Sequence, residues 1–221
     1  KLQLLEIPRT GHRGEGVRVL NLYCGIGGNR LLWEGVDVTA VDYNPDVLEV
    51  YSHYNPQDTV VCGDAHQYLL DHYDKFDFIW ASPPCPTHSK MMKFTKQDLR
   101  KYPDMSLYQE VLWLTHFFSG DWVIENVRPY YEPLIKPQSI GRHVFWSNKI
   151  IHAAEVASPR GFIDTNSSKD VALLQDWLGI HWDKPIYLGD HDPNKAYRNA
   201  VHPRLGLDVF LSATRKEGLF A

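Results

Sequence analysis

The sequence is poor in cysteine, has no long apolar run and carries no excess of positive charge. Its three cysteines among 221 residues are too few for a disulfide framework. No apolar run approaches the roughly 18 residues that a membrane-spanning helix needs, so no membrane partner is expected. Nor is there a basic leader followed by an apolar stretch, so no secretion signal is expected. These absences favour a soluble intracellular protein, and the length suits one compact domain.

The charge balance is slightly acidic, with 23 Lys and Arg side chains against 27 Asp and Glu, and a formal net charge of −4. A protein that holds nucleic acid by electrostatics alone is usually markedly basic, so the composition argues against a passive coating protein. One local basic run is present, at Lys90, Lys93, Lys96, Arg100 and Lys101. It fits either a solvated helix face or one side of a nucleic-acid groove, and both interpretations stay open.

Strand-like and helix-like segments alternate along the first 127 residues. Strands are predicted at residues 17–23, 38–42, 59–64, 76–81 and 122–127, and helices at 29–35, 45–54, 65–72 and 107–118. This alternation predicts an α/β fold with a mostly parallel sheet and helices on both faces. Beyond about residue 150 the alternation weakens. Residues 155–195 are predicted to form a small loop-rich appendage, and periodicity returns only at residues 209–211.

Three consecutive predicted strand ends carry residues suited to an adenosine ligand. Gly25, Gly27 and Gly28 follow the first strand, and glycines at such a turn let backbone N–H groups approach a ligand closely. Asp42 ends the second strand, where an acid commonly binds ribose hydroxyls, and Asp64 ends the third, where a carboxylate can accept from an adenine amino group. Each feature alone also fits a tight turn or a helix N-cap. Together, at one edge of a parallel sheet, they predict an adenosine site.

The glycine spacing bears on what the adenosine carries. The turn is Gly-x-Gly-Gly rather than the spaced G-x-G-x-x-G that admits a pyrophosphate. An adenosine without phosphates, as in S-adenosylmethionine, therefore fits at least as well as a dinucleotide. Tyr43 could lie against the adenine face, although a half-buried packing tyrosine is the commoner outcome. No metal site is expected, because the histidines are scattered and the cysteines lie far apart in the sequence.

Two further strand ends carry groups suited to covalent chemistry. Prolines at 83, 84 and 86 stiffen the loop after the fourth strand, and Cys85 lies within it as a candidate nucleophile. An isolated cysteine is more often structural, and Cys24 and Cys62 are interpreted in that way. Glu125 ends the strand at 122–127, where its carboxyl group could assist thiolate attack on an electron-poor ring as a general acid. The simpler alternative for Glu125 is an ordinary exposed glutamate.

Four segments in this order resemble the cytosine-5 DNA methyltransferases. They are residues 20–28 (LNLYCGIGG), 82–85 (SPPC), 125–127 (ENV) and 198–203 (RNAVHP). The resemblance covers about residues 17–150 and 195–212, and its proline–cysteine and glutamate–asparagine elements are specific when found together. It implies a Rossmann-like class I methyltransferase fold, S-adenosylmethionine as cofactor and S-adenosylhomocysteine as product.

The resemblance also implies a role for each matching residue. Cys85 would add to carbon 6 of a cytosine flipped out of a duplex, and Glu125 would contact N3 and the exocyclic amine. Arg142 is a further candidate catalytic residue, and Asn126 would brace the cysteine loop. Cofactor contacts are expected from the strand-end residues Tyr23, Gly25, Gly27, Gly28, Asp42, Tyr43, Asp64 and Pro83, and from Asn199. Nucleic-acid contacts are expected from the polar and basic residues Ser89, Lys90, Lys93, Arg128 and His143.

The sequence departs from the family pattern at three points. Pro86 stands where the family usually has Gln after the cysteine. One arginine of the usual arginine-rich motif is missing from residues 141–148, so Arg142 or His143 is expected to hold the target base or a phosphate. Arg198 stands where glycine is usual, which leaves an acidic, modified S-adenosylmethionine open as the methyl donor.

The resemblance predicts three parts of the chain. A cofactor-binding and catalytic domain would span residues 1–150, a small target-recognition appendage 151–194, and a C-terminal segment 195–221 would return to the catalytic domain. Only 46 residues, 149–194, are left for target recognition. Such a short region favours short or lax sequence specificity, or help from a second subunit or a second copy of the chain.

The leading expectation is a DNA (cytosine-5)-methyltransferase acting on double-stranded DNA. Its expected location is the cytoplasm, either near the bacterial nucleoid or in the host cell of a phage. Its expected role is restriction-modification or the self-protection of a phage. One alternative is methylation of RNA or of a free nucleotide through the same Cys85 addition. Another is a non-catalytic regulatory relative, which the presence of Cys85, Glu125 and the glycine turn disfavours.

Overall fold

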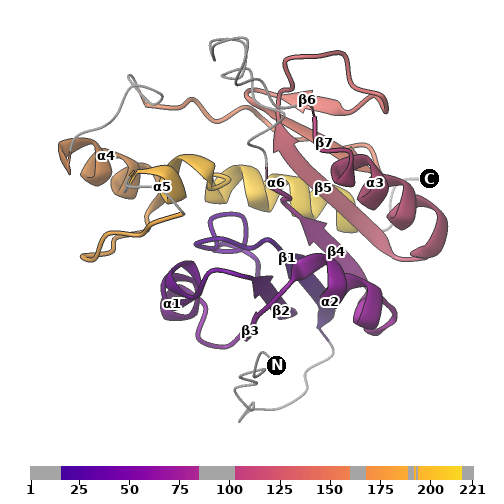
Figure 1. The fold of residues 1–221 in the computed structure, drawn as a ribbon, viewed down its shortest axis with the longest axis horizontal. Helices are drawn as coiled ribbons and strands as arrows, with labels where there is room; N and C mark the ends of the chain where they lie inside the picture. The colour runs from indigo at the N-terminus through magenta and orange to yellow at the C-terminus, as the bar shows by residue number, and fades with distance from the viewer. Residues whose placement is uncertain (1–15, 85–102, 160–167, 189–191, 193, 216–221) are drawn as a thin grey trace.

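The structure is a computed structural model that describes residues 16–84, 103–159, 168–188, 192 and 194–215 (Figure 1). Within these ranges, seven strands form one sheet in the order β3-β2-β1-β4-β5-β7-β6. Their bounds are β1 Val17–Leu22, β2 Val36–Asp42, β3 Thr59–Cys62, β4 Phe78–Ala81, β5 Asp121–Val127, β6 Gln138–Ile140 and β7 His143–Ser147. The predicted mostly parallel α/β sheet is confirmed.

The strand order places the ligand crevice. β1 pairs in parallel with both β2 and β4. The strands β2 and β3 lie on one side of β1, and β4 and β5 lie on the other, so the strand order reverses at β1. In open α/β sheets, ligands bind beyond the carboxyl ends of the strands at such a switch point. Past β5 the direction reverses, because β7 pairs antiparallel with β5 and β6 pairs antiparallel with β7. The site is therefore expected between the loops that leave β1 and β4.

Helices cover both faces of the sheet. They are α1 Pro45–Tyr54, α2 Ala65–His72, η1 Tyr73–Lys75, α3 Ser106–Phe117, α4 Ser168–Leu178, α5 Lys195–Asn199 and α6 Pro203–Thr214. Residues of α2 and α3 share one core cluster with the sheet, and residues of α6 share a second cluster on the opposite face. Figure 1 shows α6 as the long yellow helix crossing behind the strands. None of the helices in the described ranges is both long enough and apolar enough to cross a bilayer.

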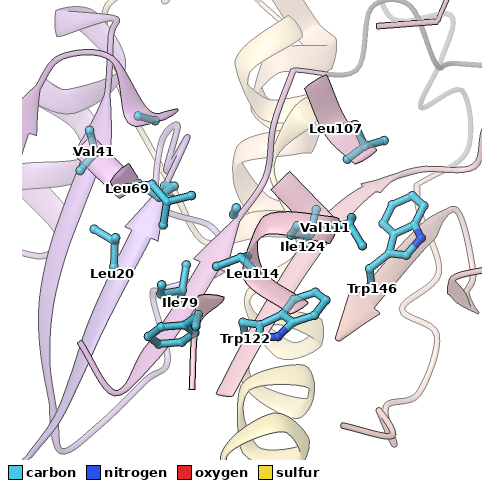
Figure 2. Packing of buried hydrophobic residues seen from close by; sticks show 14 of the residues in the cluster. Leu20, Val41, Leu69, Ile79, Leu107, Val111, Leu114, Trp122, Ile124 and Trp146 are labelled. Carbon is cyan, nitrogen blue, oxygen red and sulfur yellow. The ribbon is translucent and has the colours of Figure 1, made fainter. Parts of the chain in front are cut away.

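The face under α3 is packed at helical spacing. Leu107, Val111 and Leu114 lie on one side of α3 and are buried against sheet residues that include Ile124 and Trp146 (Figure 2). An apolar stripe recurring every three or four residues buries one helix face in this way. α3 is thereby fixed over β5 and β7, the strands that carry Glu125 and His143.

Two predicted helices have the predicted bounds because their first turns are marked in the sequence. Pro45 opens α1, and the Asn44 side chain accepts a hydrogen bond from the Asp46 backbone N–H as an N-cap. Asp64 caps α2 by accepting from the Gln67 N–H at 3.0 Å. The N-cap interpretation of Asp64 is therefore confirmed, and it leaves further acceptor positions on the same carboxylate.

The predicted helix at residues 29–35 is absent, and that prediction is wrong. The chain instead makes consecutive turns with Gly27 N–H to Cys24 O, Arg30 N–H to Gly27 O and Trp33 N–H to Arg30 O hydrogen bonds. These i to i+3 bonds replace the i to i+4 pattern of an α-helix. Gly27 has a φ of +81°, outside the right-handed helical region, so no α-helix runs through the glycine turn itself. Consequently no helix N-terminus faces the glycine turn.

Beyond residue 150 the chain contains more helix than periodicity predicted. Within the predicted appendage, Leu174 and Leu178 of α4 pack in the same cluster as Val47 and Tyr51 of α1. α6 extends well past the predicted 209–211 segment in both directions. The C-terminal third of the chain thus contributes to the core on the α1 and α6 face. A role for residues 151–194 in target recognition stays a prediction.

Candidate active site

The loop that leaves β1 forms one wall of the crevice. Tyr23, Gly25 and Gly27 have φ values of +53°, +52° and +81°, so the backbone turns sharply three times within five residues. Positive φ is inexpensive for glycine and strained for tyrosine. The Gly25 N–H donates to the Asp42 Oδ2 at 3.0 Å, which ties the loop to the end of β2.

Asp42 is buried where the first two strands end. Its side chain also accepts from the Asn44 N–H at 3.0 Å, so both carboxylate oxygens have a backbone donor. Burial raises the pKa of Asp42, and hydrogen bonds from the backbone of Asn44, Gly25 and Tyr43 oppose that rise. Each carboxylate oxygen has a second lone pair, so the group can still accept from two vicinal hydroxyls.

The surroundings of Asp42 fit an adenosyl group. A Cβ built on Gly25 or on Gly63 would meet no atom of the described residues within 4 Å, so the backbone there borders open space. Asp64, directly after Gly63, is exposed, and the Tyr43 ring is 65% exposed beside Asp42. An adenosyl group needs acceptors for its ribose hydroxyls and its amino group, and a flat surface for its base. The two carboxylates can supply the acceptors, and the exposed tyrosine ring can supply the flat surface. These residues would hold the adenosyl part of S-adenosylmethionine.

The other two glycines of the turn are close-packed. A Cβ on Gly27 would lie 2.8 Å from Cδ2 of Tyr51, and one on Gly28 would lie 2.4 Å from the carbonyl oxygen of Val201. Both glycines therefore permit contacts between the turn and other elements, namely α1 and the C-terminal segment. Their predicted contact with a cofactor stays a prediction.

The Tyr23 hydroxyl belongs to a network that the sequence analysis missed. It donates to Glu110 Oε1 at 2.5 Å, and His66 Nδ1 lies 3.3 Å from the same oxygen. Glu110 lies on the buried side of α3, and its Oε2 has no hydrogen-bond partner among the described residues. Burial raises the pKa of Glu110, whereas Tyr23 and His66 oppose that rise. Burial and the Glu110 charge likewise raise the pKa of Tyr23. A signal was present, since Glu110 falls at i+3 from Leu107.

The loop that leaves β4 forms the opposite wall. The Ser82 N–H donates to the Leu22 carbonyl at 3.2 Å, and Pro83 is buried. The Asn126 side-chain amide donates to the Pro83 carbonyl at 3.1 Å, so the end of β5 braces the start of this loop, in agreement with the role expected of Asn126. Cys85 itself lies outside the described residues. So do Ser89, Lys90, Lys93 and the rest of the basic run.

Glu125 and His143 form a buried pair at the reacting end. β5 and β7 are paired so that Glu125 lies opposite Phe145 and Val127 opposite His143. Glu125 and His143 are therefore diagonal neighbours on one face of the sheet, within reach of long side chains. His143 Nδ1 lies 2.6 Å from Glu125 Oε1, and the side chains are only 5% and 7% exposed. An exposed glutamate is thus excluded for Glu125.

Arg142 contacts the C-terminal segment. Its guanidinium donates to the carbonyl oxygens of Arg198 and Ala200, each at 3.1 Å. These carbonyls flank Asn199, the exposed last residue of α5, so Arg142 connects the start of β7 to the segment expected beside the cofactor. The Arg198 guanidinium forms an ion pair with Asp192. Both guanidinium groups, those of Arg142 and Arg198, therefore have partners within the protein.

The remaining predicted nucleic-acid residue, Arg128, is exposed directly after β5, and its backbone N–H donates to the Arg142 carbonyl. In the part of the chain that the structure describes, no group of three His, Cys, Asp or Glu side chains is arranged to hold a metal ion. The described candidate site therefore consists of the strand-end carboxylates Asp42 and Asp64, which would face an adenosyl group, and the buried Glu125–His143 pair on β5 and β7.

The sequence model of one family matches this chain. The family is described as C-5 cytosine-specific DNA methylase, and the match covers residues 17–132. That range contains the glycine turn, the cysteine loop and Glu125.

Two curated proteins are similar to parts of the chain. The tRNA (cytosine(38)-C(5))-methyltransferase of Homo sapiens is 29% identical over 154 residues, which is 58% of this chain and 39% of that protein. The type II methyltransferase M1.BsuMI of Bacillus subtilis strain 168 is 27% identical over 151 residues, 57% of this chain and 35% of that protein. The chain thus spans little more than a third of the length of these relatives.

Among solved structures, a mutant of DNMT2 from Spodoptera frugiperda is 27% identical, with a TM-score of 0.39, covering 51% of this chain and 36% of that one. The S. pombe Dnmt2 methyltransferase is 19% identical, with a TM-score of 0.42, covering 81% and 66%. Both TM-scores are low, so the fold assignment rests on the strand order and directions given above.

Proposed function

Because the chain belongs to the C-5 cytosine-specific DNA methylase family, we propose that it transfers a methyl group from S-adenosylmethionine to carbon 5 of cytosine in DNA. The proposal includes a covalent intermediate with Cys85 and extrusion of the target base from the duplex, which costs a few kcal/mol. S-adenosylmethionine, when bound, supplies an electrophilic methyl group.

The residues would act in a fixed order. The Cys85 thiolate adds to carbon 6, and the displaced ring electrons move to N3, which takes the proton of the Glu125 carboxyl group. Carbon 5 is now nucleophilic and takes the methyl group. Loss of the carbon 5 proton to solvent re-forms the double bond to carbon 6 and expels the thiolate. The N3 proton returns to Glu125, so both side chains end in their starting states.

One observation carries the proposal. The end of β5 bears Glu125 and also, through the Asn126 amide, holds the start of the cysteine loop at the Pro83 carbonyl. The Glu125 carboxyl group and the first residues of the loop that would carry the nucleophile are therefore held at one strand end. Proximity of this kind turns a bimolecular reaction into an effectively intramolecular one.

The second candidate is the same chemistry on RNA. It is favoured by the similarity to the human protein named as a tRNA (cytosine(38)-C(5))-methyltransferase. DNA remains the first proposal, because the family description names DNA and the bacterial relative is named as a type II methyltransferase.

A trapping experiment tests both candidates. Duplex DNA containing 5-fluorocytosine is incubated with the protein and S-adenosylmethionine, and an RNA of the same sequence is treated in parallel. With fluorine at carbon 5 there is no proton to lose after methyl transfer, so the thiolate is not expelled. The adduct should therefore persist through denaturation. We expect a DNA adduct with the wild type and none with Cys85→Ala. An adduct with RNA alone would move the assignment to RNA, and no adduct with either would contradict covalent catalysis.

A further inference from the structure

The Glu125 carboxyl group has one hydrogen-bond partner in the described residues, and that partner is a histidine. The His143 Nδ1 to Glu125 Oε1 distance of 2.6 Å is shorter than that of an ordinary N–H···O hydrogen bond. Both side chains are almost completely buried. Inside a protein such a contact is worth more than in water, because little solvent competes for either partner.

The His143 ring is held for this contact. It lies at the start of β7, whose pairing with β5 fixes its position relative to Glu125, and its centroid is 6.2 Å from that of Phe145. Within the described part of the chain, the His143 side chain makes no other hydrogen bond. Only one of the two carboxyl oxygens of Glu125 is engaged, so Oε2 is left for a substrate.

We propose that His143 is a positioning residue that acts through Glu125, an inference that rests on the proposed function. A neutral His143 ring donates its Nδ1–H to Oε1 and fixes the carboxyl group with Oε2 toward the pyrimidine. When the Oε2 proton passes to N3, the new carboxylate is stabilised by the same Nδ1–H. When N3 returns the proton, the starting pair is restored, so His143 neither gains nor loses a proton over one turnover.

This role differs from direct contact with the target base or a phosphate, which the sequence predicted for Arg142 or His143. Arg142 donates to the carbonyls of Arg198 and Ala200. His143 is buried with its Nδ1 against the carboxyl group. The missing arginine of the motif would thus be replaced by a donor to Glu125 rather than by a second contact with DNA.

The test compares two substitutions at one position. His143→Asn keeps an N–H donor near the place of Nδ1, whereas His143→Leu removes the donor and keeps a similar volume. Methyl transfer to duplex DNA is measured under steady-state conditions, together with the Kd for S-adenosylmethionine and the Tm. His116→Leu, which removes an exposed histidine from α3, is the control for loss of a histidine.

We expect His143→Leu to lower kcat about 100-fold, the usual effect of removing one donor to a charge that develops in the transition state. The Kd for S-adenosylmethionine should stay within about 2-fold, and His143→Asn should recover at least about 10-fold of the loss in kcat. In a Glu125→Gln background, His143→Leu should have little further effect, because residues that act as a unit are not additive.

Three results would overturn the inference: unchanged kcat in His143→Leu, equal losses in the Leu and Asn variants, or losses that multiply in the double variant. A fall in Tm with a matching rise in the cofactor Kd would also overturn it, since that pattern indicates a merely structural role. Failure of the proposed function is distinguishable, because the wild type and His116→Leu would then transfer no methyl group either.

Discussion

The ion pair between Arg30 and Asp58 offers a sharp test of how the cofactor loop is held. The guanidinium donates from Nε and Nη2 to the two carboxylate oxygens at 2.8 and 2.9 Å, and from Nη1 to the Trp33 carbonyl at 2.6 Å. The side chains are 3% and 1% exposed. The Tyr51 hydroxyl donates to the same carboxylate at 2.8 Å. This pair ties the turns after Gly28 to α1 and the start of β3.

The substitution Arg30→Ala leaves the Asp58 carboxylate buried without its guanidinium. Breaking a buried ion pair by removing one partner typically costs about 3–5 kcal/mol, because the other charge stays in a low dielectric. For a chain of this size, each kcal/mol lowers the Tm by about 2–4 °C. The expected fall in Tm is therefore roughly 6–20 °C.

The matched control is Arg18→Ala. Arg18 makes the same two-bond contact with Asp77, at 2.9 and 2.7 Å, but its side chain is 53% exposed. Solvent screens such pairs, so we expect no measurable change in stability.

Urea unfolding monitored by tryptophan fluorescence measures both variants, with free energies from linear extrapolation. The double variant Arg30→Met with Asp58→Asn should recover part of the loss, since neither charge is then stranded. Equal effects of Arg30→Ala and Arg18→Ala would refute the reasoning, because burial is the property in which the two pairs differ.

Three further outcomes follow from the described contacts. Arg142→Ala removes two charged hydrogen bonds, including the one to the Ala200 carbonyl, and should lower the free energy of unfolding by about 2 kcal/mol. Amide hydrogen exchange in residues 195–205 should become faster, which mass spectrometry can detect. Gly28→Ala forces a Cβ to within 2.4 Å of the Val201 carbonyl; we expect a loss of about 1–3 kcal/mol and weaker cofactor binding by calorimetry. Because burial raises the pKa of Glu110, the folded protein keeps a proton that the unfolded chain releases, and stability falls as pH rises through that raised value. Glu110→Gln should therefore gain in Tm relative to the wild type between pH 4 and 8; an advantage that shrinks with rising pH would contradict this sign.

Local signals in the sequence were enough to predict the bounds of helices whose first turns carry a capping side chain or a proline. Asn44 and Pro45 define the start of α1, and Asp64 defines the start of α2, so both helices have the predicted bounds. α6 has the same kind of signal, because Pro203 occupies its first turn and Leu205 and Val209 are four residues apart. That helix could have been predicted, and only residues 209–211 were recognised.

The parts that were wrong or missed depend on long-range contacts. The segment at 29–35 has helix-forming residues, but Arg30 is committed to Asp58, 28 residues away. The Glu125–His143 pair depends on β7 pairing antiparallel with β5, and a local residue pattern does not tell which strands become neighbours in the sheet. The network around Glu110 joins α3 to residues 23 and 66, which no local pattern connects.

The contact between the turns after β1 and the C-terminal helix has a consequence for biosynthesis. A Cβ on Gly206 would lie 2.4 Å from the Asn29 carbonyl, and the Trp33 indole N–H donates to the Gly206 carbonyl, 173 residues further along the chain. A nascent chain on the ribosome has already made β1 long before this partner emerges from the exit tunnel. The turns after β1 can therefore reach their final packing only after residue 206 has been synthesised and has left the exit tunnel.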